Sequence, residues 1–344
     1  MKMKLGMSFA ILIFLLATIA CGRSIDIFSP VNYDTGMTPV VAGVEKSNII
    51  IEMHDSSSRD LYYHVGTADL DNNRVNWGSS QYMGAGLSPS VAVSEGGVVA
   101  EAHEEGDVNG DEGDGNIITT IGIASVNDDQ ISWGSGQKLG DTLYNPAICI
   151  TRDGKTAVLI YEGNKEGTYT VHEVTLWYRV GNVDAVNKTV SWGAAVAYDQ
   201  GIYASISINN LGHIITVNSS WQSNTALWYS VGQLNADNTV SWGGTSSFNE
   251  GEIGAKVSIG DDPGNGTGSN LMLVYPGRLN DGALWLSVGD LPTGSTTADW
   301  VTSVCYGRSS QDVQPACTYA YNKTMVEVHD GSTLNWKLWY GFAQ

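Results

Sequence analysis

Residues 24–36 read SIDIFSPVNYDTG, and they align without a gap on residues 189–201, which read TVSWGAAVAYDQG. The second segment is part of a unit that recurs along the chain. The last copy of this unit contains Leu338-Trp339-Tyr340 but lacks the outer part, because the sequence stops at Gln344. We therefore expect residues near the N-terminus to complete a unit that begins near the C-terminus.

The recurring unit contains an apolar run that ends in Val-Gly or a close variant, then a polar turn, then a strand that ends in Trp-Gly. The apolar runs end at Gly66, Gly122, Gly181, Gly232 and Gly289. The Trp-Gly strand follows at Trp77, Trp133, Trp192 and Trp242, and it weakens at Trp300. Two more short segments, rich in β-branched residues and bounded by turn residues, precede each run, which is typical of strands.

Small sheets that repeat in a ring, with a strand from the opposite terminus completing the last sheet, are typical of a β-propeller. The sequence therefore predicts an all-β fold with six blades of four antiparallel strands, closed by the N-terminal strand. We expect one domain over residues 24–344, since the repeat runs from end to end. No helical periodicity is found in this range.

Charge argues against two classes of partner. The chain carries 17 Lys and Arg against 36 Asp and Glu, for a formal net charge of -19. Such a field repels phosphate backbones and anionic lipid surfaces. We expect no nucleic-acid partner.

The first 20 residues are typical of an export signal, with Lys2 and Lys4 before a short apolar stretch. Residues 17–21 (ATIAC) are similar to the lipobox of bacterial lipoproteins, which would make Cys21 a lipidation site. Ordinary cleavage near Ala20 is the alternative. Either route predicts an extracellular, cell-surface or periplasmic protein, with membrane contact only through a lipid on Cys21.

Two cysteines lie where they could pair in an oxidising compartment. Cys305 falls in the last strand of one unit, and Cys317 falls in the first strand of the next. A disulfide between them is one expectation. The alternative is that both are small buried hydrophobic residues, as Cys149 would be.

Polar residues recur where the second strand of each unit ends. His54, His103 and His329 occupy this position, and an acid follows each one. In a propeller these strand ends share one rim, so we expect a binding surface there. A repeated structural role, sugar binding, and metal binding or acid-base catalysis are the alternatives. Recurrence favours multivalent binding over a single catalytic centre. The candidate ligand-binding residues are His54, Asp55, His103, Glu104, Tyr161, Glu162, Trp221, Tyr275, His329 and Asp330.

An acidic, glycine-rich segment lies in the second unit, between its second and third strands. Oxygen ligands at alternating positions suit a hard cation such as Ca²⁺. The candidate ligands are Asp107, Asn109, Asp111 and Asp114. A solvated acidic surface loop is the alternative, and we expect no cofactor to be required.

The six-fold repeat and the N-terminal closing strand resemble six-bladed propellers of the sialidase-like superfamily and the fucose-binding lectin propellers. The superfamily carries Ser-x-Asp-x-Gly-x-x-Trp boxes before the fourth strand, and here residues 68–77 (ADLDNNRVNW) and 235–242 (NADNTVSW) keep the Trp after a polar turn. The full box is not present, and the arginine triad that binds the substrate carboxylate in sialidases has no counterpart. The resemblance implies a fold and a link to glycans.

Together these features favour a non-enzymatic recognition module whose partner is a glycan or glycoconjugate. A first alternative is a glycan-active hydrolase that uses rim carboxylates, with the acidic second blade as its candidate centre. A second alternative is a scaffold that binds proteins, which predicts a contiguous apolar patch on the rim.

Overall fold

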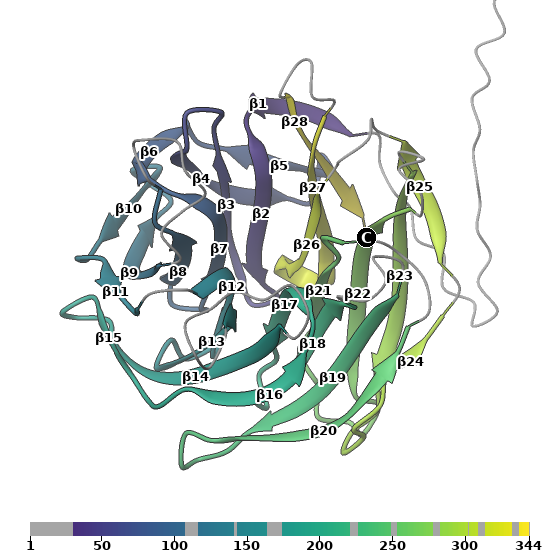
Figure 1. Ribbon diagram of the computed structural model, residues 1–344. Helices are drawn as coiled ribbons and strands as arrows, with labels where there is room; N and C mark the ends of the chain where they lie inside the picture. The colour runs from purple at the N-terminus through teal and green to yellow at the C-terminus, as the bar shows by residue number, and fades with distance from the viewer. Residues whose placement is uncertain are drawn as a thin grey trace, which may run out of the picture.

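The computed structural model describes residues 30–106, 116–140, 143–163, 174–220, 226–248, 253–277, 283–301, 303–308, 314–331 and 337–343. These residues form six antiparallel sheets arranged as a ring (Figure 1). The predicted six-bladed all-β propeller is therefore confirmed. We number the blades 1 to 6 in chain order, and we name each junction by the two blades that it joins.

The first three blades each have five strands. Blade 1 contains β2 (Met37–Val44), β3 (Ser47–Asp55), β4 (Asp60–Asp69), β5 (Arg74–Trp77) and β6 (Gln81–Ala85). Blade 2 contains β7 (Leu87–Val93), β8 (Val98–Glu104), β9 (Ile117–Ser125), β10 (Gln130–Trp133) and β11 (Gln137–Lys138). Blade 3 contains β12 (Leu143–Ile150), β13 (Thr156–Gly163), β14 (Thr175–Asp184), β15 (Thr189–Trp192) and β16 (Val196–Gln200). In each of them the last two strands pair with the same neighbour, so they are two pieces of one outer edge.

The last three blades follow the same plan. Blade 4 contains β17 (Ile202–Ile208), β18 (His213–Ser219), β19 (Leu227–Leu234) and an unbroken outer strand β20 (Val240–Ser247). Blade 5 contains β21 (Lys256–Ile259), β22 (Ser269–Pro276), β23 (Ala283–Leu291), β24 (Asp299–Trp300) and β25 (Val304–Arg308). Blade 6 contains β26 (Pro315–Ala320), a short 3-10 turn (Tyr321–Lys323), β27 (Thr324–Asp330), β28 (Lys337–Ala343) and, from the other end of the chain, β1 (Val31–Thr35).

Ring closure follows the prediction. Strand β1 pairs antiparallel with β28, with Val31 opposite Tyr340 and Thr35 opposite Lys337. The Asn32 side-chain amide also donates to the Leu338 carbonyl at 2.8 Å. Tyr33 reaches across to blade 1 and stacks on Trp77 at 5.4 Å between ring centroids. The closing strand therefore completes blade 6 and packs against blade 1.

The Val-Gly and Trp-Gly motifs are explained by a pair that recurs across the third and fourth strands. In blade 4, Gly232 lies opposite Trp242. A Cβ added to Gly232 would lie 2.8 Å from Cε3 of Trp242, closer than real Cβ contacts. The same opposition occurs at Gly66 and Trp77, Gly122 and Trp133, Gly181 and Trp192, and Gly289 and Trp300. Glycine is therefore required because the indole ring covers its backbone.

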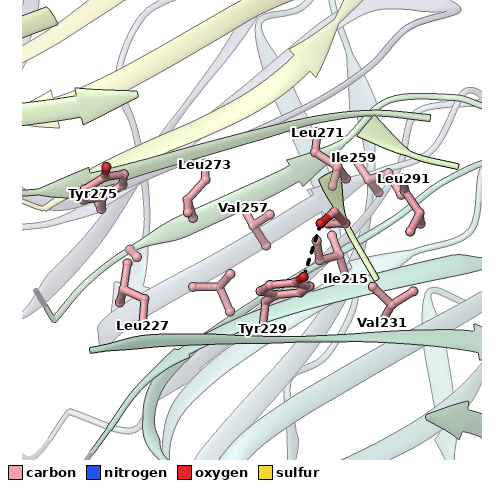
Figure 2. Close-up of a cluster of buried hydrophobic side chains, with 13 residues drawn as sticks. Ile215, Leu227, Tyr229, Val231, Val257, Ile259, Leu271, Leu273, Tyr275 and Leu291 are labelled. Carbon is pink, nitrogen blue, oxygen red and sulfur yellow. Dashed lines mark hydrogen bonds between the residues drawn. The ribbon is translucent and has the colours of Figure 1, made fainter. Parts of the chain in front are cut away.

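Apolar clusters fill the spaces between blades, and Figure 2 shows the one between blades 4 and 5. Leu227 and Tyr229 of blade 4 face Val257 and Leu273 of blade 5. The Tyr229 hydroxyl donates to the carbonyl of Ala298 at 3.3 Å, so its polar end is satisfied inside the cluster. Aromatic side chains such as Tyr229 and Tyr275 therefore form part of the apolar packing between blades 4 and 5.

The cysteine expectation needs a correction. Cys149, Cys305 and Cys317 are free thiols, so the expected disulfide between Cys305 and Cys317 is not formed. Cys305 is exposed on β25, at the outer edge of blade 5. Cys317 is buried on the innermost strand of blade 6, and its thiol points to the Lys256 carbonyl at 3.4 Å. The alternative prediction, that the cysteines are small buried residues, holds for Cys149 and Cys317.

A search for membrane-spanning helices among the described residues finds none of sufficient length and apolar character. The export signal and Cys21 lie outside those residues.

The Gly and Trp pair can be tested within one hairpin of blade 4. Gly232→Ala should lower the free energy of unfolding by about 1–3 kcal/mol, because the Trp242 ring must move out of its packing site. Gly244→Ala, on the same hairpin, is the control, since a Cβ there meets nothing within 4 Å. Urea denaturation followed by Trp fluorescence measures both. Equal stability of the two variants would contradict this explanation.

Candidate functional site

The strand registers bring the predicted site residues to one face of the ring. The end of β3 lies opposite the start of β2, with Asp55 facing Met37. The end of the outer strand β6 lies opposite Asp60 at the start of β4. The other blades repeat this arrangement, with Glu104 opposite Leu87 in blade 2. We call this face, where second strands end and first strands begin, the rim.

Each rim histidine is held by a glutamate two residues earlier on its own strand. Nδ1 of His54 lies 3.1 Å from Oε1 of Glu52. Nδ1 of His103 lies 2.7 Å from Oε1 of Glu101. Blade 6 repeats the pair with Glu327 and His329 at 2.9 Å. Residues two apart in a strand point to the same side, which explains the spacing. The sequence signal Glu-x-His was available but was not used in the prediction.

The three histidines are buried side chains. Burial alone would lower the pKa of His54, but the charge and hydrogen bond of Glu52 outweigh it, so its pKa is raised. The pKa values of His103 and His329 are raised for the same reason, by Glu101 and Glu327.

Four acids follow the rim residues of blades 1, 2, 3 and 6, and each one bonds to the next blade: Asp55, Glu104, Glu162 and Asp330. Each accepts a backbone N–H from the start of that blade's first strand. Asn145 donates to Glu104 at 2.8 Å, and Ser88 donates to Asp55 at 3.3 Å. Tyr203 donates to Glu162 and Thr38 donates to Asp330 in the same way. The acids expected to bind ligand thus join neighbouring blades.

The donors of these hydrogen bonds have an unusual backbone. Thr38, Ser88, Asn145 and Tyr203 have φ angles of 46°, 49°, 47° and 53°, in the left-handed region that non-glycine residues rarely adopt. Each lies at a shift in the register between the first and second strands of its blade. In blade 5 the matching position is occupied by Gly254, which adopts a positive φ without strain. The preceding blade has Ser219 where the others have an acid. We infer that the carboxylate bond offsets the strain.

Burial raises the pKa of the rim acids. It brings Asp55 and Asp330 to a pKa of about 6 and Glu162 to a pKa of about 7. The pKa of Glu104 is raised for the same reason. These pKa values lie near neutral pH, so the carboxyl groups that join the blades change protonation state close to pH 7.

The remaining predicted residues have separate surroundings. Tyr161 is buried, and its hydroxyl accepts a hydrogen bond from Nε of Arg179 at 3.1 Å. Tyr275 is buried against the edge of Phe248, with ring centroids 5.6 Å apart. Trp221 and the proposed calcium ligands Asp107, Asn109, Asp111 and Asp114 lie outside the described residues.

The rim residues do not converge on one pocket, because each belongs to a different junction. The central channel is narrow, with a cavity of about 80 Å³ between the first strands and another of about 50 Å³ at the rim mouth. Pockets for small ligands measure about 300–1,000 Å³. The channel volume therefore suits a few water molecules and not a sugar.

The prediction missed a set of aromatic residues on the third strands, which lies beside the predicted rim residues on the second strands. The second residue of each Leu-Trp-Tyr run pairs across the strands with the rim residue of the same blade. Unlike their buried partners, these side chains remain partly exposed. They are Tyr62, Trp177, Trp228, Trp285 and Trp339, with Ile118 at the same position of blade 2. The Leu-Trp-Tyr repeat was the signal in the sequence, but the prediction did not use it.

Contacts within the same blade fix the positions of two of these aromatic side chains, Tyr62 and Trp177. The Tyr62 ring stacks on His54, with ring centroids 5.8 Å apart and planes inclined by 13°. The Trp177 indole N–H donates to the Gly163 carbonyl at 3.1 Å. Trp228 is exposed by 36%.

Comparison with known proteins identifies the architecture. Neither a protein-family model nor a curated protein matches the chain. Among solved structures it is similar to a Trypanosoma rangeli sialidase (12% identity, TM-score 0.57, covering 94% of this chain and 56% of that chain). It is also similar to a Penicillium chrysogenum alpha-L-arabinanase complexed with arabinobiose (11% identity, TM-score 0.60, covering 92% and 98%). A third is a mutant of AofleA from Arthrobotrys oligospora (10% identity, TM-score 0.55, covering 92% and 86%).

At these identities the likeness shows the fold alone. The resemblance to sialidase-like propellers is confirmed at that level. The chain spans about half the length of the sialidase that it matches.

The rim acids predict a pH dependence of stability. The pKa of Glu162 is raised from an ordinary 4.5 to about 7, so folding favours its protonated form. Its contribution to stability is full below pH 4.5 and is lost as the pH rises through 7. The loss should amount to roughly 3 kcal/mol at most. Glu162→Gln should remove this part of the pH slope in urea denaturation between pH 4.5 and 8.

Glu95→Gln is the control for Glu162→Gln, because Glu95 is a partly exposed carboxylate in a turn on the opposite face of the ring. This variant should keep the wild-type slope. An unchanged slope in Glu162→Gln would contradict the prediction.

Proposed function

We propose that this protein is an exported glycan-binding module that binds sugars at the junctions between blades on the rim. The observation that carries the proposal is the ring of partly exposed aromatic side chains, one in each of five blades, beside a ring of buried polar residues. An aromatic face packs against the apolar face of a sugar ring, and nearby polar groups bond its hydroxyls.

The repetition of the arrangement supports binding at several equivalent places. Trp228 pairs across the strands with Asn218, Trp285 with Tyr275, and Trp339 with His329. Weak sites that repeat around a ring reach high avidity on a multivalent surface. Each site then has to supply only modest affinity.

The state of the acids favours binding over hydrolysis. Most glycoside hydrolases use a pair of carboxylates that flank the scissile bond. The rim acids Asp55, Glu104 and Glu162 each accept a backbone N–H of the next blade, and they lie at different junctions. The names of the solved sialidase and arabinanase support a link to glycans. The typical export signal in residues 1–20 supports action outside the cytoplasm.

A glycan array probed with the fluorescently labelled protein tests the proposal. Trp228→Ala should weaken binding several-fold, because one stacking platform is lost. Combining Trp228→Ala with Ala at Trp177, Trp285 and Trp339 should abolish binding. Tyr321→Ala is the matched control, since this aromatic side chain is 41% exposed on the opposite face, between β26 and β27.

Three other outcomes would overturn the proposal. A blank array with the wild-type protein would favour the protein-binding scaffold. Loss of binding in Tyr321→Ala but not in Trp228→Ala would assign recognition to the other face. Release of reducing ends from the bound glycans would favour the hydrolase.

A further inference from the structure

Three side chains from three strands meet where the ring closes. Asp34 lies on β1, His54 on β3 and His64 on β4. The Nε2 atom of His64 lies 2.8 Å from Oδ2 of Asp34, and that of His54 lies 3.9 Å from the same oxygen. One potential ligand atom from each residue lies within 4.8 Å of the other two.

Both imidazoles are already oriented for binding through Nε2. The Nδ1 atom of His54 contacts the Glu52 carboxylate at 3.1 Å. The Nδ1 atom of His64 donates to the Gly78 carbonyl at 2.9 Å. In metal sites the second ring nitrogen of a histidine ligand is held in this way, by a carboxylate or a backbone carbonyl. Such contacts fix the tautomer that leaves a lone pair on Nε2.

The carboxylate is oriented too. Oδ1 of Asp34 accepts the Thr35 backbone N–H at 2.8 Å, which leaves Oδ2 facing the histidines. Gly36 allows the chain to pass close to His54, since a Cβ there would collide with the imidazole ring. The side chains of His54 and His64 are 2% and 5% exposed, whereas that of Asp34 is 24% exposed. The cluster is therefore closed on the imidazole side and open beside the carboxylate.

The junction between blades 3 and 4 is an internal comparison. Residues 198–201 (YDQG) repeat residues 33–36 (YDTG), so Asp199 matches Asp34. There Oδ2 of Asp199 accepts from the hydroxyl of Ser230, which occupies the place of His64. Asn218 occupies the place of His54. The backbone arrangement is the same, but hydroxyl and amide groups replace both imidazoles.

The other histidine junctions lack the additional ligands. At the junction of blades 1 and 2, His103 has Thr120 in the place of His64 and Gly84 in the place of Asp34. At the junction of blades 5 and 6, His329 has Gly341 in the place of His64. Within the described part of the chain, the closure junction alone combines two imidazoles with a carboxylate in this way.

We propose that Asp34, His54 and His64 bind one divalent transition-metal ion of the zinc class, which links the closing strand to blade 1. Two imidazole nitrogens and one carboxylate oxygen suit Zn²⁺, whereas Ca²⁺ prefers oxygen ligands alone. Ligand atoms about 2.0–2.1 Å from a tetrahedral metal lie roughly 3.3 Å apart, so the observed separations need only small shifts. The open side next to Asp34 leaves a fourth position for water.

Metal titration of the purified protein, without a polyhistidine tag and treated with EDTA, tests this site. Co²⁺ should produce visible absorption bands with a stoichiometry of one, and Zn²⁺ should displace it. Zn²⁺ should also raise the melting temperature, because it binds the closed ring and not the open one. Ca²⁺ should cause neither effect. These readouts do not depend on sugar binding, so the site and the proposed function can fail separately.

Substitutions taken from the chain itself sharpen the test. The double variant His54→Asn with His64→Ser copies the side chains of the junction between blades 3 and 4. It should lower the affinity for Zn²⁺ at least 100-fold. His103→Asn, the matched control, removes a rim histidine with the same glutamate contact and should leave affinity unchanged. If the double variant folds poorly, Asp34→Asn keeps the shape of the more exposed ligand and should also lose affinity.

Two results would overturn the proposal. The first is a wild-type protein that binds neither Co²⁺ nor Zn²⁺. The second is metal binding that survives the double variant and Asp34→Asn, since the metal would then be held elsewhere.

Discussion

Main-chain pairing between β1 and β28 is the constraint on which the rest of the molecule depends. It turns a row of six sheets into a ring, in which every blade has two neighbours. A blade buries apolar residues on both faces, so each open end of the row would expose one such face to water. The same pairing carries Tyr33 onto Trp77 and Asp34 onto His64, which belong to blade 1. Closure therefore forms both a core contact and a polar cluster.

A second interaction holds neighbouring blades in position on the rim. Buried carboxylates such as Glu104 accept the N–H of a residue in the next blade, and that residue has a left-handed backbone. This arrangement lowers the stability of the fold in two ways, through backbone strain and through the burial of an acid. It persists at four junctions because the carboxylate satisfies a backbone donor that the register shift leaves unpaired. The acidic residues of the rim thus have a structural role, because they hold neighbouring blades together.

Most of the fold could be predicted from the sequence, because the strand pattern recurs and its glycines and tryptophans have fixed places. The candidate site was less predictable. His54 was found from its rim position, but Glu52 beside it was not, although the two share one face of a strand. Asp34 and His64 meet only through packing between blades, which strand periodicity does not encode. Asp55 was expected to face a ligand, and its bond to Ser88 follows from a bulge that has no clear sequence signal.

The separation of the paired strands along the chain has a consequence for how the molecule is made. The Asn32 side chain and the Leu338 carbonyl that it contacts are 306 residues apart. Synthesis delivers β1 first and β28 last, so blades 1 to 5 can assemble while the ring is still open. During that interval β1 has no partner, and unpaired strand edges favour association between chains. A chain that stays unfolded until its synthesis is complete would avoid this hazard, because β28 is then available when β1 folds.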